Sequence, residues 1–249
     1  MRTVAIWSIK GGVGKTAAAV NIAHAASVGG TRTLLWDLDP QGAASFYLRV
    51  PARLEGGARI VVDHTTDLGW HARPTEFDNL SLLPADFSFR RLDLELDATK
   101  KPRKQLARRL EPLATRYDLV IMDCPPSVSL VSEAVVRAAD AELVPVIPST
   151  LSIRTLEQIR EFVVEHGRGR TELLPFLSMV DRRKAMHLEL CERCLADPGF
   201  LRTVIPSASV VERMGLTRAP VAATLPSQPV AQAFTSLWEE LAARLHIIT

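Results

Sequence analysis

The segment from Lys10 to Thr16 places glycines, two lysines and a threonine at a spacing that suits phosphate binding. It reads KGGVGKT and ends in the Gly-Lys-Thr of a phosphate-binding loop. The standard loop also has a glycine five residues before its last glycine, but Ile9 stands at that position. A second lysine, Lys10, follows instead. The pattern therefore indicates a phosphate site with one lysine more than the standard loop.

Each residue type in this segment has a defined role in nucleotide chemistry. Glycines allow a close turn in which backbone N–H groups converge on phosphate oxygens. Lys15 is expected to reach the β- and γ-phosphates, and the Thr16 hydroxyl is expected to bind Mg²⁺. The predicted nucleotide-binding residues are Lys10, Gly11, Gly12, Val13, Gly14, Lys15, Thr16 and Ala17. The alternative is a glycine-rich turn with two incidental lysines.

The flanking residues predict the elements that such a loop requires. Residues 3–9 are apolar and partly β-branched, as in a buried parallel strand. Residues 15–27 are rich in alanine and predict a helix. The N-terminus of that helix would point at the phosphates and favour their negative charge. Strand, loop and helix thus follow in the order that the motif demands.

Three aspartates lie at or just after the ends of other apolar strands. Asp37 ends the predicted strand 32–37, and Asp39 follows it in DLDPQG. Asp123 ends the predicted strand 118–123, where phosphate-loop proteins place an acid that holds Mg²⁺ directly or through water. The structural alternatives are an Asp-Pro turn for the first pair and a capping carboxylate for Asp123.

Predicted strands and helices alternate along nearly the whole chain, which indicates an α/β fold. We expect a mostly parallel, twisted sheet with helices on both faces, of the phosphate-loop nucleotide hydrolase type, as a single domain spanning residues 1–249. Ligands then bind beyond the carboxyl ends of the strands. Further strands are expected at 80–83, 142–147, 176–180 and 202–205, and further helices at 103–116, 131–139, 152–165, 184–195 and 229–245. A short β-like run at 60–62 lies in the part of the chain where the sequence pattern predicts secondary structure least clearly.

Composition sets the broad class of the protein. The chain has 249 residues, 47% of them hydrophobic, and a net charge of +2. The sequence has neither a secretory leader pattern nor an apolar run of the roughly 20 residues that span a bilayer, so a cytoplasmic protein is expected. Three cysteines, an odd number, argue against a disulfide framework.

The three motifs taken together resemble the ParA family within the ParA/MinD group of ATPases. They are KGGVGKT, DLDPQG and DCPPS (Asp123 to Ser127), in that order. Weaker similarity continues through LLPA, PVIPST, MVDRR and APV into the last helix, so it covers nearly the whole chain. Because the first predicted strand already begins at Thr3, the chain resembles the short ParA proteins, which do not read an operator themselves.

The resemblance implies roles for individual residues of an ATP- and Mg²⁺-dependent ATPase. Lys10 would be the signature lysine of the deviant phosphate loop, which reaches the partner's phosphates in an ATP-sandwich homodimer, much as an arginine finger does. Asp39 would position the attacking water, so Lys10, Lys15 and Asp39 are the expected catalytic residues. Asp37 and Asp123 would join Thr16 on the metal side. Residues near Met179 and Pro206 would line the adenine pocket.

The resemblance also implies partners and a cellular role. Short ParA proteins partition or position DNA or another cargo, bind DNA without sequence preference when loaded with ATP, and are stimulated by a ParB-like protein. A cytoplasmic, nucleoid-associated protein that does not bind membranes is therefore expected. The candidate DNA contacts are Arg182, Arg183, Lys184, Arg202, Arg213 and Arg218. The segment PSTLSIRTLEQI after Pro145 departs from the family, where many members carry a tyrosine and a glycine.

Two alternative functions come from weaker signals. Cys191 and Cys194 form a C-x-x-C that shares a predicted helix face with His187. Three such ligands would suit an iron–sulfur carrier ATPase. The structural alternative is that all three are semi-buried residues of a helix. The last helix is amphipathic, as in membrane-associated MinD proteins, but it lacks their basic face. We therefore expect it to pack on the core through Val230, Phe234, Leu237, Leu241, Leu245 and Ile248.

Overall fold

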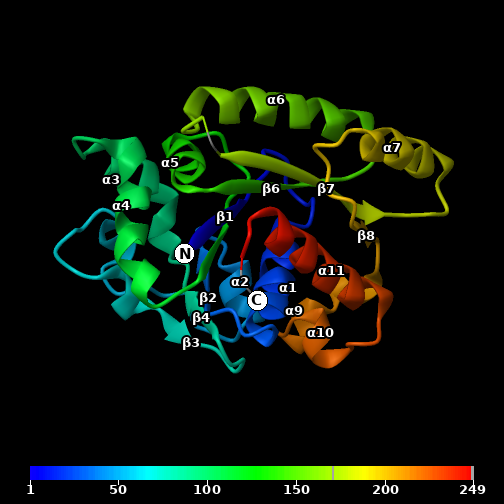
Figure 1. Cartoon of the computed structure of the whole chain (residues 1–249). Helices are drawn as coiled ribbons and strands as arrows, with labels where there is room; N and C mark the ends of the chain where they lie inside the picture. The colour runs from blue at the N-terminus through cyan, green and yellow to red at the C-terminus, as the bar shows by residue number, and fades with distance from the viewer. Residues whose placement is uncertain (170, 248–249) are drawn as a thin grey trace.

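The computed structural model describes residues 1–169 and 171–247, whose strands all join one eight-stranded sheet (Figure 1). The strand order is β3-β4-β2-β5-β1-β6-β7-β8, and every pairing is parallel except that of β3 with β4. The strands are β1 (Arg2–Ile6), β2 (Thr33–Asp37), β3 (Arg73–Pro74), β4 (Leu80–Leu83), β5 (Leu119–Asp123), β6 (Ala141–Val146), β7 (Glu172–Val180) and β8 (Val204–Pro206). The predicted parallel α/β fold is confirmed.

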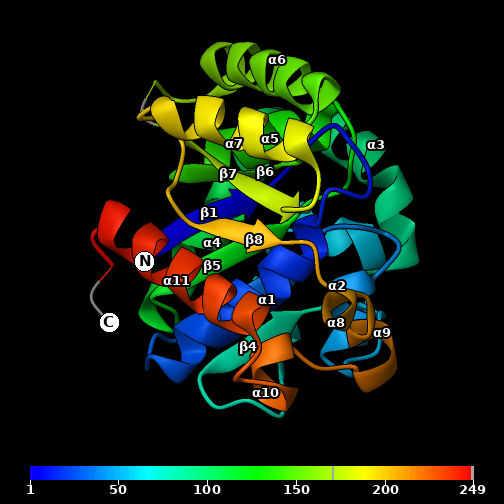
Figure 2. The ribbon, with the colours of Figure 1, turned by 90° about the vertical axis from the view of Figure 1, so that its right-hand side faces the viewer.

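Helices cover both faces of this sheet, as Figures 1 and 2 show from two sides. The α-helices are α1 (Lys15–Val28), α2 (Ala43–Tyr47), α3 (Leu92–Asp97), α4 (Gln105–Leu110), α5 (Leu130–Ala138), α6 (Thr150–His166), α7 (Ala185–Ala196), α8 (Ser209–Glu212), α9 (Met214–Thr217), α10 (Val221–Thr224) and α11 (Pro229–Arg244). The 3₁₀-helices are η1 (Gly57–Val61), η2 (Leu68–His71), η3 (Phe87–Arg91), η4 (Pro102–Lys104) and η5 (Glu111–Thr115).

Two hydrophobic clusters, one on each face, hold these layers together. Alternate residues of β1 divide between them, with Ala5 in one cluster and Val4 and Ile6 in the other. The first cluster contains side chains of α3 to α7, and the second contains side chains of α1 and α11. Because both faces are covered, the central strands are apolar along their length rather than alternating with polar residues.

Two local predictions differ from the structure. The predicted helix 103–116 is divided into η4, α4 and η5. α4 ends just before Pro112, which lies in the first turn of η5, lacks an N–H and cannot continue an α-helix. The β-like run 60–62 lies instead at the end of η1, which begins after Gly56 in a left-handed conformation (φ 83°). A short apolar run fits a buried helical turn as well as a strand, so the pattern alone did not separate them.

The last helix packs on the core, as expected. Phe234, Leu237 and Leu241 of α11 are buried in the second cluster, and α11 lies against α1. Ile248 falls outside the described residues. None of the helices in the described part of the chain combines the length and the apolar character needed to cross a membrane.

One buried ionisable side chain in this core has no partner in the part of the chain that the structure describes. Glu142 on β6 is fully buried, and neither of its carboxylate oxygens has a hydrogen-bond partner among the described residues. Burial raises the pKa of Glu142 well above its ordinary value. A carboxyl group held in this way favours its neutral form and lowers stability wherever the unfolded chain can ionise it.

We predict that Glu142→Met raises the free energy of unfolding at pH 8 by about 1–3 kcal/mol, because it removes an unpartnered polar group from the core. The unfolded glutamate loses its proton near pH ~4.3, below the raised pKa in the folded state. The wild type therefore loses stability as pH rises from the unfolded-state pKa towards the raised folded-state pKa. The gain in unfolding free energy from Glu142→Met should shrink at pH 4. Urea unfolding at both pH values measures this. The exposed Glu189→Met is the control, and an equal gain at the two pH values would contradict the prediction.

Candidate functional site

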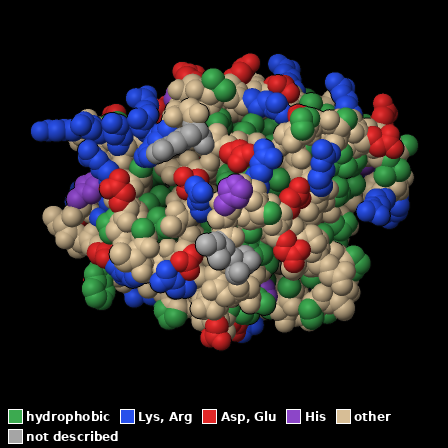
Figure 3. Space-filling model, in the orientation of Figure 1, with side chains coloured by type: hydrophobic (Ala, Val, Ile, Leu, Met, Phe, Trp, Pro, Cys, Tyr) green, Lys and Arg blue, Asp and Glu red, His purple; other side chains and the backbone are tan. Residues whose placement is uncertain are grey.

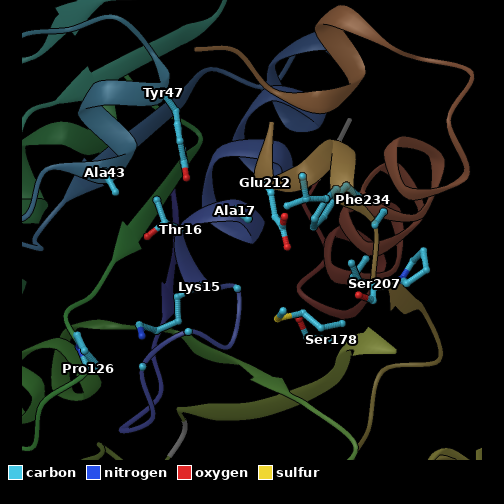
Figure 4. A pocket seen from close by; sticks show the side chains of 18 of the residues that line it. Lys15, Thr16, Ala17, Ala43, Tyr47, Pro126, Ser178, Ser207, Glu212 and Phe234 are labelled. Carbon is cyan, nitrogen blue, oxygen red and sulfur yellow. The ribbon is translucent and has the colours of Figure 1, made fainter. Parts of the chain in front are cut away.

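A cavity of about 470 Å³ opens beside the start of α1, at the carboxyl ends of the strands. Figure 4 shows Lys15 and Thr16 on one side of it, with Tyr47, Glu212, Phe234, Ser178 and Ser207 around the remainder. Its size suits a nucleotide, since small-molecule sites measure about 300–1,000 Å³. The predicted residues that line it are Gly11, Gly12, Gly14, Lys15, Thr16, Ala17, Asp39, Met179 and Pro206.

The phosphate loop requires glycine where the backbone turns most sharply. Gly14 has a φ of 92°, and a Cβ there would lie 3.1 Å from the Ser178 hydroxyl. That hydroxyl donates a 2.9 Å hydrogen bond to the carbonyl of Val13. The end of β7 therefore supports the loop that follows β1, and the positive φ together with this close approach favours glycine at position 14.

Lys15 lies deep in the site, with 7% of its surface exposed. Its Nζ donates a 3.3 Å hydrogen bond to the carbonyl of Lys10. Burial lowers the pKa of Lys15, while the carboxylates of Asp123 and Asp39 partly oppose that change. The lysine is thus placed as a desolvated cation, whose attraction for an anionic ligand is stronger than in water.

Two fully buried aspartates lie side by side next to this lysine. Parallel pairing of β2 with β5 sets Asp37 opposite Asp123. Pairing of β1 with β5 sets Ile6, the last residue of β1, opposite Asp123 as well. Burial is the main cause that raises the pKa of Asp37 to about 6. Burial, followed by the charge of Asp37, raises the pKa of Asp123 well above its ordinary value.

The two aspartates differ in how they are held. Asp37 Oδ2 accepts hydrogen bonds from the Ser45 amide and hydroxyl, both at 2.8 Å, and its Oδ1 accepts one from the Asp39 amide at 3.3 Å. Neither oxygen of Asp123 has a partner among the described residues, although Thr16 and Lys15 partly oppose the rise in its pKa. An unpartnered buried carboxylate beside a threonine hydroxyl fits a hard cation such as Mg²⁺, which prefers oxygen ligands.

Asp39 stands apart from this buried pair. It lines the cavity, and its Oδ1 accepts a 2.9 Å hydrogen bond from the Gln41 amide. Its carbonyl accepts another from the Gly42 amide at 2.9 Å, which closes a tight turn after β2. This turn presents the Asp39 carboxylate to the space where a nucleotide would bind.

Lys10 does not line the cavity. It lies in a separate gap between the loop, β6 and α6, where its Nζ donates a 3.3 Å hydrogen bond to the Ser152 hydroxyl. Ser149 caps α6 and lies 3.0 Å from the same hydroxyl, oxygen to oxygen. The structure therefore brings Lys15, Thr16 and Asp39 together at one cavity and leaves Lys10 outside it.

Several residues of the site could not be predicted from the sequence. Ser45 and Ser178 hold Asp37 and the phosphate loop, whereas Tyr47 and Phe234 line the cavity. They come from three separate elements, so no local motif groups them. Met179, which was predicted, has a φ of 56° at an irregularity in the pairing of β7 with β8, and such an irregularity can redirect a side chain.

Three of the six candidate DNA-binding residues make contacts with neighbouring groups. Arg183 pairs with Asp181, Arg202 donates to the Leu195 carbonyl, and Arg218 donates to the Phe46 carbonyl and lies over the Phe46 ring. Arg182, Lys184 and Arg213 have no ion-pair partner in the described part of the chain. Half of the set is thus engaged in local contacts.

The C-x-x-C pair is part of the packing of α7. Cys191, Cys194 and His187 are buried, and burial raises the pKa of both thiols, which keeps them protonated. The His187 Nδ1 accepts a 3.1 Å hydrogen bond from the Asp181 amide. Within residues 1–169 and 171–247, no three His, Cys, Asp or Glu side chains form a group that could hold a metal ion.

Comparison with known proteins agrees with this geometry. Residues 1–172 match the AAA domain family. The chain is 29% identical over 250 residues to the sporulation initiation inhibitor protein Soj of Bacillus subtilis, covering 97% of this chain and 98% of that protein. It is 31% identical over 255 residues to the virulence plasmid ParA family protein pGP5-D of Chlamydia trachomatis, covering 99% and 96%.

Solved structures share the fold over nearly the whole chain. The ATP complex of a McdA variant from Cyanothece has a TM-score of 0.82 at 21% identity, covering 97% of this chain and 96% of that one. Cobyrinic acid a,c-diamide synthase from Mycobacterium smegmatis, with bound ADP and magnesium, has a TM-score of 0.81 at 24% identity, covering 99% and 96%.

We predict that Ser45→Ala lowers the free energy of unfolding by about 1–3 kcal/mol, because two buried groups lose a partner. The Ser45 hydroxyl donates to Asp37 and accepts from the Ala85 amide at 3.1 Å. Urea unfolding at pH 7 measures the loss, and Ser236→Ala, on the exposed side of α11, is the control. A loss below ~0.5 kcal/mol would show that these hydrogen bonds do not support the site.

Proposed function

Because the chain belongs to the ParA family of ATPases, we propose that it is a Mg·ATP-dependent dimerising ATPase that partitions or positions a cargo. ATP binding would close a homodimer, and the dimer would bind DNA without sequence preference. A ParB-like partner would stimulate hydrolysis and release the dimer from DNA. The position of Lys10 outside its own cavity is the observation that carries this proposal.

ATP and Mg²⁺ fit the residues of the cavity. The loop amides and Lys15 would hold the phosphates, and the pocket near Met179 and Pro206 would receive the adenine. Thr16 and the unpartnered Asp123 would hold the metal, which neutralises charge on the phosphates when bound. Asp37 already accepts three hydrogen bonds, so its part in metal binding would pass through water. Structures with the same fold contain ATP, or ADP with magnesium.

The chain's own residues account for most of the hydrolysis step. Asp39, on the cavity wall, would orient a water whose oxygen attacks the γ-phosphorus. The bond between that phosphorus and the bridging oxygen breaks, which releases ADP and phosphate, and the attacking water gives up its proton to the phosphate or to solvent. Lys15 would stabilise the charge that develops on the phosphoryl oxygens, and such stabilisation is the main source of catalysis in phosphoryl transfer.

Lys15 is the only lysine or arginine among the described residues that line the cavity. Lys10 contacts Ser152 of its own subunit rather than the cavity, which supports a role at the partner's phosphates. Each site would then be complete only in the dimer, much as a GTPase site is completed by an arginine finger from a second protein. Hydrolysis would follow dimerisation for that reason.

The cellular role follows from the family. The named relatives include a sporulation initiation inhibitor and a virulence plasmid protein of the ParA family. We infer a cytoplasmic protein that associates with the nucleoid and whose cargo is a plasmid, a chromosome or a protein cluster. The burial of Cys191 and Cys194 and the packing of α11 on α1 give no support to iron–sulfur transfer or membrane attachment.

We predict that DNA binding depends on ATP and is prolonged in Asp39→Ala, because the variant should bind ATP and close the dimer but hydrolyse ATP ~10²–10⁴-fold more slowly. Fluorescence anisotropy with a random-sequence duplex, in ADP and in ATP at two salt concentrations, measures this. Phosphate contacts should weaken as salt rises. If the wild type does not bind DNA in any nucleotide state, the proposed partition role is contradicted.

Lys10→Ala should still bind nucleotide but lose ATP-driven dimerisation and about 10³-fold or more of its stimulated turnover, as enzymes do without a finger residue. Size-exclusion chromatography with ATP and a phosphate-release assay measure the two effects. Ser152→Ala is the matched control, since it removes the partner of Lys10 in its own subunit and should keep turnover. Unchanged turnover in Lys10→Ala would exclude the cross-dimer role.

A further inference from the structure

A second, smaller cavity of about 290 Å³ lies between α4, the end of α5 and the segment after α6. Four cationic side chains and one carboxylate line it: Lys104, Arg108, Arg137, Arg168 and Glu111. We call this cavity the basic pocket. Like charges in so small a concave surface repel one another unless an anion is present, so the pocket is suited to a negatively charged ligand.

The cations of the basic pocket are not used in structural ion pairs. None of the four has an ion-pair partner in the residues that the structure describes. Two neighbouring arginines do have partners, since Arg103 pairs with Glu133 and the buried Arg109 donates to the carbonyls of Thr66 and Ile60. The basic pocket is therefore distinct from the charged contacts that hold this region together.

Arg137 gives the strongest sign that a ligand is expected. It lies in the last turn of α5, and its Nε is buried without a hydrogen-bond partner among the described residues. Helix C-termini favour cations, which suits Arg137 and Arg108 in the last turns of α5 and α4, but this leaves the Arg137 Nε without a partner among the described residues. Guanidinium groups match phosphate oxygens in pairs, so two oxygens of one phosphate could satisfy a single arginine.

The positive surface continues beyond the pocket. Lys100 and Lys101 are exposed just before η4. In Figure 3, lysine and arginine side chains gather at the upper left, over the connection between α3 and α4 in Figure 1. A single small anion would need only the pocket, whereas a row of phosphates would use the wider surface as well. A nucleic-acid backbone therefore matches this surface better.

The basic pocket also lies away from the ATP site. α5 begins after the carboxyl end of β5 and ends just before β6 begins, and α6 ends shortly before β7 begins. Arg137 and Arg168 thus lie near the amino ends of the strands, at the edge opposite the phosphate loop. A dimer that closes over the phosphate loops leaves both basic pockets open to solvent.

We propose that the basic pocket binds the phosphate backbone of DNA, and that it contributes more to this binding than the arginines between residues 182 and 218. This inference rests on the proposed function and assigns its DNA contact to a surface.

The test compares two double variants of the full chain with Mg·ATP present. Lys104→Glu/Arg108→Glu reverses two exposed charges of the pocket, and Arg182→Glu/Lys184→Glu reverses two exposed cations outside it. We expect the first to weaken binding to a random-sequence duplex by about 10-fold or more and to reduce the salt slope by roughly 2. The second should bind within about 2-fold of the wild type. Circular dichroism and basal ATPase activity check that both variants fold.

The possible outcomes separate this inference from the proposed function. If the pocket variant binds DNA as tightly as the wild type does, the inference is overturned and the proposed function is not. An equal loss in both double variants would also overturn it, because net charge rather than the pocket would then decide binding. No DNA binding by the wild type would overturn both. Binding to vesicles of anionic phosphatidylglycerol but not to DNA would assign the pocket to lipid headgroups and overturn it too.

Discussion

The site depends on the parallel register of three strands. Pairing of β2 and β1 with β5 brings Asp37 and Asp123 together and places both at the base of the loop that follows β1. Two buried carboxylates at adjacent register positions repel each other, and burial already disfavours their charged forms. Lys15 offsets part of this unfavourable charge, so the loop and the two strand ends form one electrostatic unit. A shift of one residue in either pairing would separate its members.

The two hydrophobic clusters maintain this register. Residues of β1 contribute to both clusters, and the surrounding helices bury the sheet from each side. Polar side chains then complete the site from outside the central strands, with Ser178 supporting the phosphate loop and Ser45 holding Asp37. The catalytic geometry therefore rests on the packing of the whole sheet, while the supporting serines adjust it locally.

The sequence predicted much of this arrangement because its main signals are local. The KGGVGKT motif lies between a strand and a helix, and Asp37 and Asp123 each end an apolar run. The sequence could not predict contacts between distant segments, such as that of Ser178 with Val13 or of Lys10 with Ser152. The basic pocket was missed for the same reason, since Lys104, Arg137 and Arg168 come from three separate segments.

The contact between Lys10 and Ser152 has a consequence for how the cell could use this protein. In the proposed function, a subunit that keeps this lysine on its own α6 would lack it at its phosphates, so an isolated subunit would hold ATP with little loss through hydrolysis. In the proposed dimer, the rate of ATP consumption would then scale with the number of subunit pairs rather than with the total amount of protein. A large pool of ATP-bound subunits could be maintained with little ATP turnover, and hydrolysis would begin where two subunits meet.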